Sequence, residues 1–300
     1  MQSRTIKLKP FLDFRDLMEG VRPDLLDIGP YGTLLLPIQG DGPKMIAVCV
    51  VTDHETKRID LQTPLTIGHL QTLSNQRLLL VASRSAALDD GHGEVNAHVV
   101  DADGRFCDSF CVGDGISHVK STRDDIIWVS YFDEGVLGGG DWRVPIGAAG
   151  LVAWSPAGEQ LYHLSLPPEL PRVVDGYALD VSGSDVWFSY YPEFPLVHLA
   201  GTRYVNFWRS PVAGAHTMVT HKDRVLYSPG FGKDTHYRLF HLEAHERMRP
   251  LASFQLLGHE DEPLHHCRLR ARGSRFLLIG QHGIYKLDLD DLNDNFDQSD

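Results

Sequence analysis

The stretch Asp114–Gly135, DGISHVKSTRDDIIWVSYFDEG, contains a histidine followed ten residues later by the centre of an apolar run. The same spacing recurs along the whole chain of 300 residues. Six register residues each stand ten positions before a core position: Leu25 before Leu35, His69 before Leu79, His118 before Trp128, Tyr177 before Trp187, His216 before Leu226 and His266 before Phe276. Equivalent residues of a repeat occupy equivalent places in space, so we expect the six register residues to face one site.

The apolar runs are short and rich in β-branched and aromatic residues. Examples are MIAVCVV at 45–51, IIWVSYF at 126–132 and VWFSYY at 186–191. Gly, Asp, Pro and Ser clusters separate such runs along the chain. This pattern is typical of strands joined by turns, and it predicts an all-β protein.

The register positions lie about 48 residues apart on average, which is close to the roughly 40 to 50 residues of a four-stranded propeller blade. We therefore predict a six-bladed β-propeller forming a single domain over residues 1–292, with blades beginning near 25, 69, 118, 177, 216 and 266. The last blade shows only three strands. The alternating segment 4–11, RTIKLKPF, is expected to supply the fourth and close the ring. Residues 293–300 are expected to form an acidic flexible tail.

Composition restricts the classes of partner. The formal net charge is −12, whereas nucleic acids and anionic membranes are bound through clustered Lys and Arg, so neither is expected as a partner. No segment approaches the length of an apolar membrane span, and the first residues lack the apolar run of a signal peptide. We expect a cytoplasmic protein whose partner is a small-molecule ligand or another protein.

Four stretches resemble one known repeat: 114–135, GLVAWSPAGEQLYHL at 150–164, DGYALDVSGSDVWFSYYPEFPLV at 175–197 and AGAHTMVTHKDRVLYSPG at 213–230. In each, an inner strand, a turn and a second strand follow one another, as in six-bladed propellers of the NHL and gluconolactonase-like kind. Together they are similar to a group of uncharacterised bacterial propeller proteins. The resemblance implies the fold and carries no assigned activity. The Glu, Asn and Asp that gluconolactonase-like enzymes use find no match, since Asn96 and Asn206 fall on expected outer strands.

The register also predicts where a ligand would bind. The innermost strand of each blade starts at the mouth of the central channel, so His69, His118, His216 and His266 should converge there, together with Tyr177 and Leu25. Loops on the same face carry Arg84 and Trp142. We expect both to contribute to ligand binding, with Trp142 on a flap over the channel mouth.

Three functions stay open. The leading one is a binding module that recognises a small polar ligand or a partner segment at the His-lined channel. The second is a metal-dependent enzyme, a lyase, lactonase or oxygenase, in which the four histidines hold a divalent transition metal. Tyr177, Asp175, Asp133 or Glu134 would then act as acid or base. The third is a protein interaction scaffold. Histidines of a wet channel also bond to water and backbone without any function.

Overall fold

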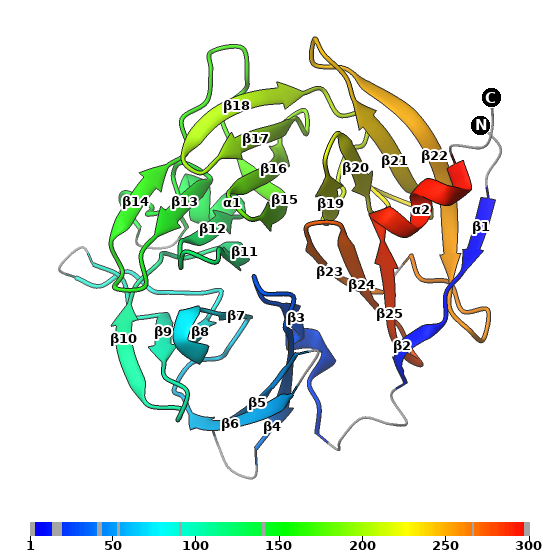
Figure 1. Ribbon diagram of the computed structural model, residues 1–300. Coiled ribbons are helices and arrows are strands. Elements are labelled where there is room, and N and C mark those ends of the chain that lie inside the picture. Colours follow the sequence, from blue (N-terminus) through cyan, green and yellow to red (C-terminus); the bar gives the residue numbers. More distant parts are fainter. Residues whose placement is uncertain are drawn as a thin grey trace.

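A computed structural model describes residues 4–13, 20–40, 44–52, 55–89, 92–139, 142–265 and 267–296. Six sheets stand around a central axis, and within each sheet the strands follow one another outward from the axis (Figure 1). The predicted six-bladed β-propeller is confirmed. No helix in these ranges is both long and apolar enough to cross a membrane.

In each blade the strands follow one another outward in sequence order, four in each of blades 1 to 5 and three in blade 6, and an N-terminal strand adds to the outer edge of each of blades 5 and 6. Blade 1 contains β3 (Asp27–Ile28), β4 (Leu34–Gln39), β5 (Met45–Val51) and β6 (Thr56–Gln62). Blade 2 contains β7 (His69–Thr72), β8 (Leu78–Val81), β9 (Ala97–Val100) and β10 (Phe106–Phe110). Blade 3 contains β11 (Ile116–Ser121), β12 (Ile127–Tyr131), β13 (Leu151–Trp154) and β14 (Gln160–His163). Blade 4 contains β15 (Asp175–Ser182), β16 (Asp185–Tyr191), β17 (Leu196–Ala200) and β18 (Arg203–Trp208). Blade 5 contains β19 (Met218–His221), β20 (Arg224–Tyr227), β21 (Tyr237–Leu242) and β22 (Met248–Leu257). Blade 6 contains β23 (Arg268–Arg272), β24 (Arg275–Ile279) and β25 (Gly283–Asp288) with an N-terminal strand.

The N-terminal segment closes the ring with two strands. Strand β2 (Pro10–Asp13) pairs antiparallel with β25 and completes blade 6, as expected. Strand β1 (Arg4–Lys7) instead pairs in parallel with β22 at the outer edge of blade 5 (Figure 1). The expected single strand over 4–11 is corrected on this point. The outer edges of blades 5 and 6 both need a partner, and the segment is long enough to cover both.

A helix is the last element of the described part of the chain. Helix α2 (Leu289–Phe296) follows β25 directly. Leu289 and Leu292 are buried in the same core cluster as Phe276 and Tyr285. Two apolar residues three positions apart share one face of a helix, so this pair docks the first turn onto blades 5 and 6. The helix extends to residue 296, and the acidic flexible tail over 293–300 stays a prediction, since residues 297–300 lie outside the described ranges.

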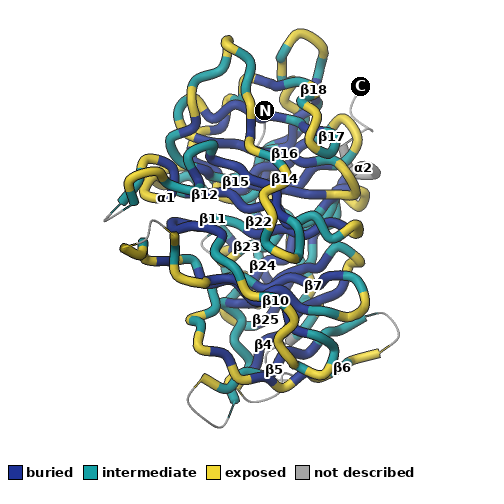
Figure 2. The backbone as a smooth tube through the Cα atoms, turned by 90° about the vertical axis from the view of Figure 1, so that its left-hand side faces the viewer, coloured by how far each residue is buried: buried dark blue, intermediate teal, exposed yellow. Residues whose placement is uncertain are grey.

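The two faces of the disc carry different features. The short helix α1 (Asp133–Leu137) lies in the loop between the second and third strands of blade 3, and α2 lies on the opposite face (Figure 2). We call the face with α1 the mouth face and the face with α2 the floor face. The innermost strands begin at the mouth face and end at the floor face. Buried side chains such as Trp128, Phe188 and Phe276 fill the space between neighbouring blades.

Candidate functional site: an axial cavity

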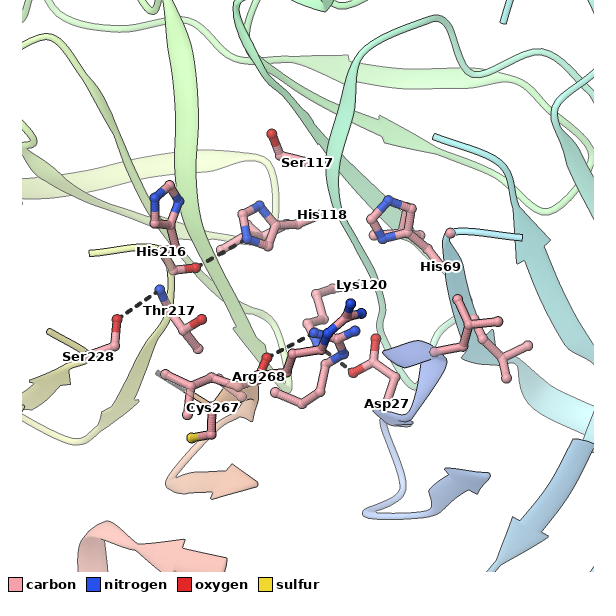
Figure 3. A pocket seen from close by; sticks show the side chains of 18 of the residues that line it. Asp27, His69, Ser117, His118, Lys120, His216, Thr217, Ser228, Cys267 and Arg268 are labelled. Atoms are coloured by element: carbon pink, nitrogen blue, oxygen red, sulfur yellow. Dashed lines mark hydrogen bonds and ion pairs between the residues drawn. The ribbon is translucent and has the colours of Figure 1, made fainter. Parts of the chain in front are cut away.

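A cavity of about 500 Å³ lies on the axis and opens at the mouth face. All six blades line it, mostly with residues at or near the start of their innermost strands. Polar and charged side chains of the lining include Asp27, His69, Ser117, His118, Lys120, His216 and Arg268 (Figure 3). Arg270 also lines the cavity. His216 and Arg268 are exposed to solvent, so ligands have access from this side.

Arg272 spans the axis at the floor end. From blade 6 its guanidinium donates to the carbonyl oxygens of Ile28 (2.8 Å), Ser121 (2.8 Å) and Val181 (3.3 Å), and to Oε1 of Gln71 (2.6 Å). These acceptors belong to blades 1, 3, 4 and 2. A single side chain that bonds to four other blades must lie at the centre of the ring. The cavity is therefore closed beneath by bonds between protein groups.

A buried ion pair continues this floor network. Lys120 Nζ lies 2.8 Å from Oδ1 of Asp27, and both side chains are less than a tenth exposed. Gln71 Nε2 donates to the other carboxylate oxygen of Asp27 at 2.8 Å. Burial alone would raise the pKa of Asp27, but the charges of Lys120 and Arg270 outweigh it and hold that pKa below its usual range.

Asp180 of blade 4 links blade 5, the one blade that Arg272 does not reach, to the floor. Its carboxylate accepts from the backbone amide and the hydroxyl of Thr220 at 3.0 and 2.8 Å, and from the amide of Gly273 at 2.8 Å. Thr220 lies in blade 5 and Gly273 follows β23 in blade 6. Complete burial nevertheless raises the pKa of Asp180. Every blade thus takes part in the polar network at the floor.

The imidazoles of His69 and His118 line the cavity above this network. His69 Nε2 lies 3.1 Å from Ser83 Oγ. His118 Nε2 lies 3.4 Å from the carbonyl oxygen of His216, which can only accept, so this nitrogen carries the proton and Nδ1 accepts from Ser130 Oγ at 2.9 Å. Burial lowers the pKa of His69 to about 4, with Arg270 adding to the effect, and burial lowers the pKa of His118 to about 3. Both rings are neutral at pH 7.

His216 and Tyr177 are close together, but only His216 lines the cavity. Their rings stack with centroids 4.8 Å apart and planes 20° from parallel. Tyr177 also contacts Phe194 and Phe231 edge-on, at 4.9 and 5.7 Å. The register residue of blade 4 therefore supports a cavity wall from behind. Leu25, its counterpart in blade 1, does line the cavity.

The remaining acid–base candidates lie outside the axial cavity. Asp175 is half-buried, and burial together with the charge of Asp133 raises its pKa to about 6. Neither residue lines the cavity. Glu134 forms an ion pair with Arg84 at 2.6 Å, and Arg84 also reaches the buried carboxylate of Asp114 at 3.0 Å. The structure brings Asp175 and Asp133 together but places neither on the His-lined wall.

Arg84 and Trp142 line a second cavity of about 430 Å³ between the mouth-face loops of blades 2 and 3. Trp142 Nε1 donates to the carbonyl oxygen of Ser85 at 3.2 Å, which fixes the indole over blade 2. The expected flap over the channel mouth is therefore wrong for Trp142. The indole N–H finds its acceptor on the neighbouring blade and the ring stays at the rim of the disc.

The four-histidine arrangement is only partly visible. His266 lies outside the described ranges. Within those ranges, no group of three or more His, Cys, Asp or Glu side chains is placed to hold a metal ion, and His69, His118 and His216 do not form one. The ring nitrogens of His69 and His118 are directed to Ser83, Ser130 and the carbonyl oxygen of His216. The hypothesis of a divalent transition metal gains no support from these residues.

Sequence reasoning missed the charged side chains of the cavity. The inner strand β23 reads RLRAR, so Arg268, Arg270 and Arg272 alternate with Leu269 and Ala271. Side chains two positions apart on a strand point to the same side. The three arginines therefore form a row along the axis, with Arg268 at the mouth, Arg270 lining the cavity and Arg272 at the floor. That alternation was the available signal.

Comparisons with known proteins support the fold and leave the site unassigned. Residues 147–287, just under half of the chain, match the model of the YxzG family. No curated protein matches the chain. Among solved structures, Hsv2 of Kluyveromyces lactis is similar at 11% identity and a TM-score of 0.53, over 93% of this chain and 80% of that one.

A second solved structure agrees with the first. The β-propeller domain of Cps50 (Swd1) from Myceliophteria thermophila is 10% identical, with a TM-score of 0.51, over 89% of this chain and 83% of that domain. Identities this low show the propeller fold alone. The resemblance to NHL and gluconolactonase-like propellers stays a prediction.

Proposed function

We propose that the protein is a binding module that takes a small polar ligand into the axial cavity. The observation that carries this proposal is the contrast between the closed floor and the accessible wall of one cavity. The floor groups bond to one another across all six blades, whereas His216 and Arg268 at the mouth are exposed to solvent. The volume, about 500 Å³, falls within the roughly 300 to 1,000 Å³ of small-molecule sites.

The chemistry of the wall suits a polar ligand. Ser117, His118 and Lys120 come from the innermost strand of blade 3, His69 comes from that of blade 2, and Arg268 comes from that of blade 6. Neutral imidazoles both donate and accept hydrogen bonds, so they can orient hydroxyl, carbonyl or oxyanion groups. A propeller fold fits a binding role or a scaffold role. The cavity favours binding, and no described group favours the metal-dependent enzyme.

The proposal is tested by filling the cavity with a large side chain and measuring the loss of ligand binding. Ser117→Trp places a large ring at a position that lines the cavity, and Ser165→Trp places the same ring on an exposed loop between blades 3 and 4 as the control. A library of neutral, anionic and cationic small molecules is screened by saturation-transfer NMR. We expect compounds that bind wild type and Ser165→Trp but not Ser117→Trp. The proposal fails if every compound that binds wild type also binds a folded Ser117→Trp variant.

A further inference from the structure

The charge inside the cavity is opposite to the charge of the chain. Among the described residues that line it, Lys120, Arg268 and Arg270 are basic and Asp27 is acidic, which leaves a formal excess of two positive charges while the histidines are neutral. The whole chain has a formal charge of −12. In the floor beneath, Arg272 and Asp180 contribute one charge of each sign. The axis is therefore a cationic hollow in an acidic protein.

Arg270 is held in place by groups that carry no net charge. Its Nε donates to the carbonyl oxygen of Leu26 at 2.6 Å, and its two terminal nitrogens donate to the carbonyl oxygens of Asp24 at 2.7 Å and Leu269 at 3.0 Å. Carbonyl groups orient a guanidinium without neutralising it. Its positive charge is felt elsewhere in the cavity, since it helps to lower the pKa of His69. The side chain is thus positioned before any ligand arrives.

Arg268 lies two residues earlier on the same side of β23, and it is exposed at the mouth. Its Nη1 lies 3.4 Å from the carbonyl oxygen of Asp24, which is a long contact. In the view of Figure 3, Arg268, Lys120 and Asp27 lie below the three labelled histidines. A guanidinium presents several N–H donors in one plane and matches the oxygens of a carboxylate or a phosphate.

We propose that the ligand of the axial cavity is a small organic anion whose carboxylate or phosphate group is bound by Arg268 and Arg270, with Lys120 beneath. This inference rests on the proposed function. The excess positive charge lies in a hollow with walls of low polarisability, which strengthens the attraction for an anion and raises its local concentration. His216, which lines the cavity and is exposed at the mouth, then hydrogen-bonds the uncharged part of the ligand.

Isothermal titration calorimetry at one fixed ionic strength tests this assignment. The probes are citrate as the carboxylate source, inorganic phosphate as the phosphate source, glucose as a neutral control and choline as a cationic control. We expect citrate or phosphate to bind with a Kd below about 1 mM. Neither glucose nor choline should bind. The better of the two anions identifies the preferred headgroup.

Paired variants locate the binding. Arg268→Gln removes the charge at the mouth, and Arg249→Gln removes an arginine of comparable exposure from the outer strand β22. We expect Arg268→Gln to weaken anion binding by roughly ten-fold or more, as loss of a charge-assisted bidentate contact does. Arg249→Gln should leave it unchanged. Affinity that stays within two-fold in Arg268→Gln overturns the inference, and so does a lack of anion binding by wild type.

The two proposals fail in different ways. If the ligands lost in Ser117→Trp are neutral or cationic, the cavity remains a binding site and the anion assignment is wrong. If Ser117→Trp retains all binding, the cavity is not the site and both proposals fall.

Discussion

The two ends of the propeller axis are built from the same six strands, but the floor end bonds to other protein groups while the mouth end is exposed to solvent. At the floor, Arg272, Asp27 and Lys120 bond to other protein groups from every side. At the mouth, Arg268 and His216 are exposed. Both regions are polar, and both are formed by the innermost strands of the repeat. A polar residue on the axis therefore indicates a site only when its hydrogen-bonding groups are still accessible to a ligand.

The largest effect is expected at Arg272, because its loss opens the floor. Arg272→Met leaves the carbonyl oxygens of Ile28, Ser121 and Val181 without this donor and removes a charge beside Asp27 and Asp180. We expect the free energy of unfolding to fall by about 3 to 5 kcal/mol. Urea denaturation measures it, with Arg249→Met on an outer strand as the control. A loss below about 1 kcal/mol would show that the floor network adds little stability.

The ion pair of Lys120 and Asp27 tests whether two side chains of the floor depend on each other for their contribution to stability. Lys120→Met leaves a buried carboxylate without its cation, and we expect a loss of about 3 kcal/mol. Adding Asp27→Asn removes the stranded charge, so the double variant should cost less than the sum of the single variants. The measurement is a double-mutant cycle in urea. Additive losses would mean that the two side chains, 2.8 Å apart, do not depend on each other.

The histidines in the middle of the axis, His69 and His118, should make stability depend on pH. The folded protein lowers the pKa of His69 to about 4 and of His118 to about 3, against about 6.5 in an unfolded chain. Below pH 6.5 the unfolded chain therefore binds more protons, and stability should fall as the pH falls towards 4. Each imidazole contributes up to about 1.4 kcal/mol per pH unit.

The double variant His69→Gln, His118→Gln checks this pH dependence. It should show a flatter dependence of the free energy of unfolding between pH 6.5 and 4 than wild type. A wild-type slope that the double variant reproduces would assign the pH dependence to other groups, such as the carboxylate of Asp27, whose pKa the fold also lowers.

The smallest effect on stability is expected at the mouth. Arg268→Gln and His216→Ala change exposed side chains, so we expect each to alter the free energy of unfolding by no more than about 0.5 kcal/mol. His216→Ala also removes one ring of a stacked pair with Tyr177, and thermal unfolding of both variants detects any larger role. A loss above 1.5 kcal/mol would place these residues with the structural floor and weaken the binding proposal.

The repeat made the fold predictable, because ten-residue spacings and β-branched runs depend on local geometry alone. The six blades, the mouth-face placement of His69 and His118 and the N-terminal closure of blade 6 could all be derived in this way. The floor could not. Arg272 meets acceptors that lie between 91 and 244 positions away in sequence, and a local pattern carries no information about such partners.

Two errors at the site have the same origin. Trp142 was expected at the channel because its loop leaves the correct face, but an indole N–H goes to whichever carbonyl is near, and that carbonyl belongs to Ser85. Tyr177 occupies a register position, yet its ring packs against Phe194 and Phe231 behind the wall. Register gives the height of a residue along the axis. It does not give the direction of its side chain.

The paired N-terminal strands bear on how the protein is made. Arg4 pairs with Phe254, and Pro10 pairs with Tyr285, so β1 and β2 find their partners only after the strands of blades 5 and 6 have been synthesised. Contacts so distant in sequence raise the contact order and slow folding. Until β1 and β2 dock, the outer edges of blades 5 and 6 lack these partners and are open to pairing with other chains. The period before ring closure is therefore when aggregation competes with folding.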